Sequence, residues 1–161
     1  MGTYLMKLKG IIDYDCVNYK EACMTLMFPY CSFKCDRENG CNVCQNSSLA
    51  EEKTLNVPTE YIIKMFNDNP LTHAICFQGL EPFDSWDELK DFIPLFRSQS
   101  TDTIVIYTGY NKEEVEDKVE WLKKQKPIVV KYGRFIPNQQ SHYDAVLGVN
   151  LASDNQYAEE L

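Results

Sequence analysis

The sequence lacks the long apolar stretch that a membrane-spanning helix requires. It contains no run of about 18 apolar residues. The first nine residues also lack the uninterrupted apolar core of a signal peptide. We therefore expect no membrane partner and a cytoplasmic location.

Basic residues are scarce as well. The chain has 16 lysines and arginines against 24 aspartates and glutamates, which gives a net charge of −8. Such a charge repels a phosphate backbone, so nucleic acid is disfavoured as a partner. Histidine is rarer still, because His73 and His142 are the two in the sequence and they lack the spacing of metal ligands.

Glycine and proline contribute seven residues each, and we find no internal repeat or low-complexity segment. The 44% of hydrophobic and 25% of charged residues are typical of an ordinary globular protein and exclude a disordered or fibrous one. A chain of 161 residues can build one core that folds unaided. We predict a single domain over residues 1–161.

Cysteine, in contrast, is concentrated in one place. Four of the seven cysteines fall within fourteen residues, directly after the apolar segment Met24–Phe28 and Pro29. Thiolates are soft ligands that suit zinc or an iron–sulfur cluster, and their close spacing lets one loop wrap a single centre. So dense a group in a cytoplasmic protein indicates metal binding more than disulfide bonding. We predict a cluster loop over residues 30–46. The candidate ligands are Cys31, Cys35, Cys41 and Cys44.

The number of ligands decides what such a site can do. Three thiolates leave one coordination position open, as in a catalytic centre, whereas four close the site, as in a structural one. Both alternatives are compatible with the spacing. The other cysteines, Cys16, Cys23 and Cys76, are predicted to be small core residues or spectators.

Apolar segments and turn residues alternate along the rest of the chain. The predicted strands are an opening strand within 5–14 and strands at 22–28, 74–77, 103–107 and 127–132. The predicted helices cover 58–66, 85–96 and 112–124. This alternation indicates an α/β protein whose parallel sheet has right-handed crossover connections. Residues 134–161 are predicted to be an irregular C-terminal segment with a short strand within 145–151.

Three unusual turns follow the predicted parallel strands. The cysteine loop follows the first, Gln78–Pro82 follows the second, and Thr108–Asn111 follows the third. Ligands bind at the C-terminal ends of strands in parallel sheets. We therefore expect one rim that holds a metal cluster, the carboxylate of Glu81 and the turn after residue 107.

The order of these features resembles the radical S-adenosylmethionine superfamily, in particular its smallest members, the activating enzymes of anaerobic ribonucleotide reductase. Cys31 and Cys35 match the first half of their C-x3-C-x2-C motif, and Val43–Asn46 is similar to its end. Phe77–Phe83 is similar to their Gly-Gly-Glu-Pro segment, and Tyr107–Tyr110 to a tetrapeptide that they carry after a later strand. Two further similar segments are Tyr132–Phe135 and Gly148–Gln156.

The resemblance implies a partial (β/α) barrel of mostly parallel strands with outer helices. It also implies one [4Fe–4S] cluster with three cysteine ligands, which by position are Cys31, Cys35 and Cys44. In that family the fourth iron binds S-adenosylmethionine, and an electron from the reduced cluster cleaves it to methionine and a 5′-deoxyadenosyl radical. The residues implied at the S-adenosylmethionine site are Gly79, Glu81, Thr108 and Tyr110.

The partners follow from the same resemblance. An activating enzyme of this kind is an anaerobic oxidoreductase that acts on a larger glycyl-radical protein, such as anaerobic ribonucleotide reductase. It receives its electron from a donor such as flavodoxin or ferredoxin.

The sequence departs from the family pattern at two places. Eight residues separate Cys35 from Cys44 where the family has two, and Cys41 lies among them as an alternative third ligand or a fourth one. Leu80 stands where the family has its second glycine. Two alternatives therefore remain beside the enzyme: a non-catalytic zinc or iron–sulfur module with four cysteine ligands, and a family member that holds a cluster but no longer reacts.

Overall fold

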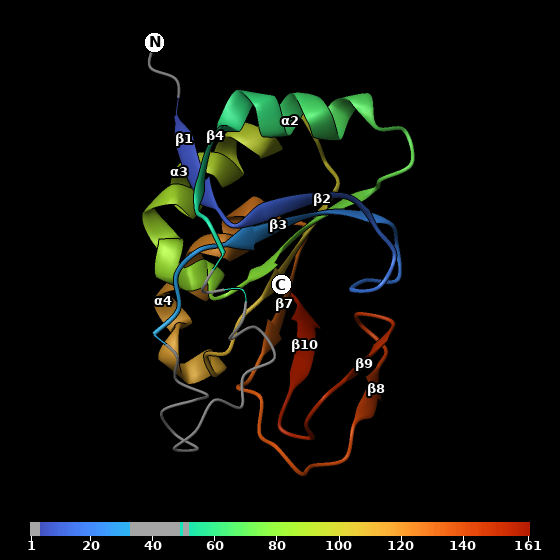
Figure 1. Ribbon diagram of the computed structural model, residues 1–161. Helices are drawn as coiled ribbons and strands as arrows, with labels where there is room; N and C mark the ends of the chain where they lie inside the picture. The colour runs from blue at the N-terminus through green and yellow to red at the C-terminus, as the bar shows by residue number, and fades with distance from the viewer. Residues whose placement is uncertain (1–3, 33–48, 50–51) are drawn as a thin grey trace.

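The computed structural model describes residues 4–32, 49 and 52–161. Its centre is a six-stranded sheet with the order β10-β7-β6-β5-β3-β2 (Figure 1). The strands are β2 (Gly10–Asp15), β3 (Cys23–Phe28), β5 (Ala74–Gly79), β6 (Thr103–Tyr107), β7 (Ile128–Tyr132) and β10 (Tyr157–Glu160). The four middle strands pair in parallel, whereas β2 and β10 pair antiparallel at the two ends. The four strands predicted from the apolar segments are thus present.

Three α-helices are formed in the described part of the chain. They are α2 (Thr59–Asp68), α3 (Trp86–Arg97) and α4 (Glu116–Leu122). Short 3₁₀ turns accompany them at η2 (Pro82–Ser85), η3 (Lys112–Glu114) and η4 (Lys123–Gln125). The helix predicted at 112–124 is therefore divided, because Val115, with φ −131° and ψ 26°, leaves the helical conformation between η3 and α4. No helix of the described residues has the length and hydrophobicity needed to cross a membrane.

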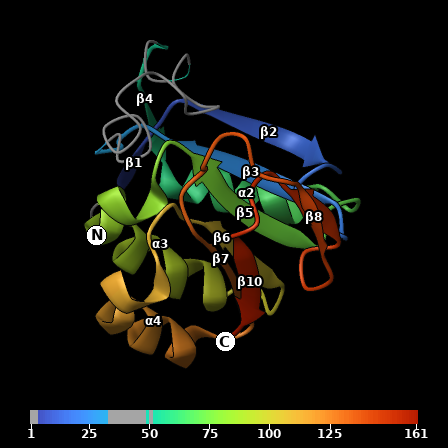
Figure 2. The ribbon, with the colours of Figure 1, turned by 90° about the horizontal axis from the view of Figure 1, so that it is seen from below.

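The helices cover one face of the sheet. Side chains alternate between the faces of a strand, so Leu26, Phe77 and Val130 pack under the helices, while Cys76 and Val105 point to the opposite face. The helices lie together on one side of the sheet in Figure 1, and Figure 2 shows α3 and α4 on one side of the strands and β8 on the other. The face without helices is thus left to the C-terminal part of the chain.

The C-terminal segment differs from the prediction. Residues 134–161 contain three strands: β8 (His142–Asp144), β9 (Val149–Leu151), which is the short strand predicted within 145–151, and β10. The strands β8 and β10 were not predicted. The strand β10 extends the main sheet along β7. Leu147 and Leu151 pack against the face opposite the helices. These strands are short and contain polar residues, so the local pattern is a weak signal. The strands β8 and β9 pair with each other across residues 145–148, whereas β10 depends on β7, which precedes both of them in the sequence.

The opening strand is also divided. The predicted strand within 5–14 forms β1 (Leu5–Leu8), which pairs with β4 (Leu55–Pro58), and β2, which joins the main sheet. Only the second of these belongs to the sheet that carries the site.

Candidate functional site

A cavity of about 390 Å³ lies at the C-terminal ends of the parallel strands. Its wall includes residues that follow β3, β5, β6 and β7, together with residues 149–152 of the C-terminal segment. The predicted site residues within the described chain all line it: Cys31, Gly79, Glu81, Thr108 and Tyr110. The structure therefore brings these residues together at one rim, and their binding roles stay predictions.

The other predicted ligands cannot be placed in the same way. Cys35, Cys41 and Cys44 lie outside the described residues. Within residues 4–32, 49 and 52–161, no three His, Cys, Asp or Glu side chains gather to hold a metal ion. The choice between Cys41 and Cys44 as third ligand stays a prediction.

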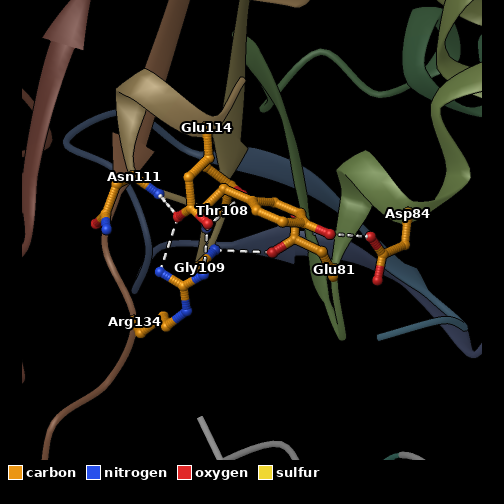
Figure 3. A network of polar contacts seen from close by, with 8 residues as sticks. Glu81, Asp84, Thr108, Gly109, Asn111, Glu114 and Arg134 are labelled. Carbon is orange, nitrogen blue, oxygen red and sulfur yellow. Dashed lines mark hydrogen bonds and ion pairs between the residues drawn. The ribbon is translucent and has the colours of Figure 1, made fainter. Parts of the chain in front are cut away.

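Glu81 joins two of the turns at the rim. Its side chain is buried, with 4% exposed surface for the residue. One carboxylate oxygen accepts a hydrogen bond of 2.8 Å from the Gly109 N–H, and the other accepts one of 2.8 Å from the Thr108 hydroxyl (Figure 3). This second oxygen also accepts a bond of 3.1 Å from the Phe83 N–H. Glu81 thereby fixes the turn after β6 against the turn after β5.

Burial also changes the acidity of this carboxyl group. It raises the pKa of Glu81 from its usual 4.5 to about 7, although the hydrogen bonds from Gly109, Thr108 and Phe83 act in the opposite direction. Because the charged form loses its hydration inside the protein, the folded chain holds this proton more tightly than the unfolded chain. Glu81 is therefore a group that changes charge near neutral pH.

This acidity predicts a pH-dependent stability. Between pH 4.5 and about 7 the folded state binds more protons at Glu81 than the unfolded state, so the free energy of unfolding should fall as the pH rises through this window. The difference between the two pKa values corresponds to a change of about 3 kcal/mol in the free energy of unfolding across this window. Chemical denaturation of the wild type and of Glu81→Gln at several pH values measures it. We expect the difference between the two proteins to vary with pH below about 7, and a constant difference would contradict the assignment.

Gly79, which the resemblance places at the S-adenosylmethionine site, ends strand β5. In the structure it has a φ of +89°, and a Cβ atom there would lie 2.5 Å from the Phe28 nitrogen, which is backbone of the neighbouring strand β3. The glycine is thus required by the packing of β5 against β3 at the rim, whatever the cavity binds.

Sequence reasoning missed Asp84. One of its carboxylate oxygens accepts a hydrogen bond of 2.6 Å from the Tyr110 hydroxyl, and the other accepts one of 2.9 Å from the Ser32 N–H. Burial and then the hydrogen bond to Asp84 raise the pKa of Tyr110 to about 12, so this phenol stays protonated and donates. The sequence offered one signal for Asp84, which is its place two residues after Pro82 in a turn expected at the rim.

Two cationic side chains of the cavity wall were also missed as site residues. Lys131 is 7% exposed and donates hydrogen bonds to the carbonyl oxygens of Thr108 at 3.3 Å and Gly133 at 2.9 Å. Arg134 donates two bonds of 2.8 Å to the carboxylate of Glu114. Lys131 looked like an ordinary strand residue because its strand was recognised by its apolar neighbours. Only the fold shows that its side chain reaches the rim.

The comparison with protein families decides what kind of site this is. A family model described as "4Fe-4S single cluster domain" matches residues 21–156. The chain belongs to this family. The match begins just before β3 and ends just before β10, so it includes the predicted cluster loop and all the turns of the rim. No curated protein and no solved structure matches the chain.

This family membership confirms the prediction of an iron–sulfur protein of the [4Fe–4S] type. The described thiols agree with it. Cys23 and Cys76 are fully buried among the apolar residues of the sheet face opposite the helices, so both are core residues. Cys31 is half-buried and lines the cavity. Its role as a cluster ligand stays a prediction.

Proposed function

We propose that this protein is a radical S-adenosylmethionine enzyme, whose cluster is held at the rim by Cys31, Cys35 and Cys44 or Cys41. The observation that carries the proposal is the shared cavity. The thiol that begins the cysteine motif and the residues of the two similar segments, Gly79 to Glu81 and Thr108 to Tyr110, line the same space. Its volume of about 390 Å³ lies within the range of small-molecule sites.

The arrangement of the strands supports the proposed fold. Four parallel strands, with all three described helices on one face, correspond to part of a (β/α) barrel. In that fold the active site lies at the C-terminal ends of the strands, where the cavity is.

The chain's own groups suit the two ends of an amino acid. A carboxylate offers about four acceptor positions, and Glu81 uses three of them for protein donors. The remaining one suits an ammonium group. Lys131 places a positive charge in the same wall and suits a carboxylate. The cluster, when bound, would supply the electron for reductive cleavage of the sulfonium.

The proposed macromolecular partner is a glycyl-radical protein. A cavity of this size holds one molecule about as large as S-adenosylmethionine, so a hydrogen-atom donor must reach it from outside. A loop of a larger protein can do so. The electron would come from a donor of the flavodoxin or ferredoxin type.

The test is anaerobic reconstitution with iron and sulfide, followed by electron paramagnetic resonance of the reduced protein. Because an open iron position binds the added ligand directly, we expect the [4Fe–4S]⁺ spectrum to change when S-adenosylmethionine is added. We also expect methionine and 5′-deoxyadenosine among the products under a chemical reductant. A spectrum indifferent to S-adenosylmethionine would refute the proposal.

A second candidate is a non-catalytic module in which all four cysteines close the site. Leu80 favours a protein that does not react, whether or not a fourth cysteine closes the site, because this residue lines the cavity where the superfamily pattern has a glycine. The same experiment separates the two candidates. A closed site gives a cluster, or zinc, with no spectral response to the ligand.

A further inference from the structure

Asp84 connects the rim to the beginning of the cysteine loop. It belongs to η2, after β5, and accepts hydrogen bonds from the Ser32 N–H and the Tyr110 hydroxyl. Three turns that follow three different strands thus meet at one carboxylate, as Figure 3 shows for the side of Asp84 that faces the turn after β6.

The contact with Ser32 is important because Ser32 directly follows Cys31. A backbone N–H next to a ligand cysteine is well placed to donate to the cluster sulfurs, and such hydrogen bonds, together with nearby charge, set the reduction potential. Here that N–H donates 2.9 Å to Asp84 instead. With Cys31 as a ligand, the Asp84 carboxylate would withhold this donor from the cluster and would add a negative charge close to the ligand backbone. Both effects disfavour the reduced cluster, which is the more negative of the two states.

We propose that Asp84 is a positioning residue for the iron–sulfur cluster, which fixes the Cys31–Ser32 backbone at the rim and keeps the reduction potential of the cluster low. The proposal rests on Cys31 being a cluster ligand. Beyond that, it requires only the iron–sulfur cluster that the family membership assigns. The proposed reductive cleavage of a sulfonium also needs a cluster with a low reduction potential.

The test is a redox titration of the reconstituted protein, monitored by electron paramagnetic resonance without S-adenosylmethionine. Asp84→Asn keeps an oxygen acceptor for the Ser32 N–H but removes the charge. We expect wild-type iron content and a higher potential, with the ratio of reduced to oxidised cluster at a fixed solution potential raised about tenfold, or about 59 mV for one electron. Asp84→Ala also releases the N–H, so we expect a larger rise and an altered spectrum.

Asp87→Asn is the matched control. It removes the same charge three residues along the chain, where the side chain is 99% exposed and solvent screens it. We expect its potential to equal that of the wild type. The proposal would be overturned if the cluster had the same reduction potential in Asp84→Asn as in Asp87→Asn. It would also be overturned if Asp84→Ala left the potential and the spectrum unchanged.

Different results would refute the premise that Cys31 is a cluster ligand and the proposed enzyme function. If Cys31→Ala retains a full cluster, Cys31 is not a ligand and the role of Asp84 is refuted with it. If the wild-type spectrum ignores S-adenosylmethionine, the proposed enzyme is refuted, but the effect of Asp84 on the potential is still expected.

Discussion

Cys31→Ala should leave the reconstituted protein with less than about one tenth of the wild-type iron content and no [4Fe–4S]⁺ spectrum. Removing a partner of a metal ligand already lowers metal affinity about 10- to 100-fold, so removing a ligand itself should have at least this effect. Cys31 lines the cavity at the end of β3 and begins the cysteine motif. Iron and sulfide analysis after anaerobic reconstitution measures the loss.

The matched control is Cys16→Ala. Cys16 is exposed, lies before β3 and does not line the cavity. We expect this variant to keep the full cluster. Equal iron content in the two variants would mean that the ligands all come from elsewhere, and the site at the rim would then be assigned wrongly.

Gly79→Ala should destabilise the protein by about 3 kcal/mol or more, or prevent folding altogether. The φ of +89° is strained for alanine, and the new Cβ would lie 2.5 Å from the Phe28 nitrogen and 2.8 Å from backbone carbon atoms of Met27. These are backbone atoms held by the parallel pairing of β3 with β5, so they cannot rotate away. The midpoint of chemical denaturation, or the soluble yield, measures the effect.

Gly109→Ala is the control for a glycine at the same rim. Its Cβ would meet Glu81 Oε1 at 3.5 Å and Arg134 Cγ at 3.8 Å, which are ordinary van der Waals distances. We expect a change within about 1 kcal/mol. If both variants were equally stable, the close packing of β5 against β3 would not be the reason for Gly79.

The two glycines also separate stability from binding. Gly109 N–H donates to Glu81 and lies in the cavity wall. Gly109→Ala adds a methyl group to a residue of the cavity wall, so we expect it to weaken S-adenosylmethionine binding while the fold remains. A loss of stability in Gly79→Ala would therefore identify Gly79 as a packing residue. A loss of binding in a folded Gly109→Ala protein would identify Gly109 as a residue of the binding site.

The sequence by itself determined the central strands and the nature of the metal site. The segments 22–28, 74–77, 103–107 and 127–132 are mostly apolar because both faces of the middle strands are covered, and such runs are recognisable without a structure. The density of cysteines indicated a soft metal centre for a chemical reason that is independent of the fold. The family comparison supports that conclusion.

Only the tertiary structure decided how the rim is held together. Asp84 contacts Ser32 from 52 residues away, and Glu81 contacts Thr108 from 27 residues away. Such contacts depend on the register of β3, β5 and β6, which no local periodicity encodes. The need for glycine at 79 has the same origin, because the atoms that a Cβ would meet belong to another strand. Burial, which raises the pKa of Glu81 to about 7, is likewise a property of the assembled turns and not of the residue.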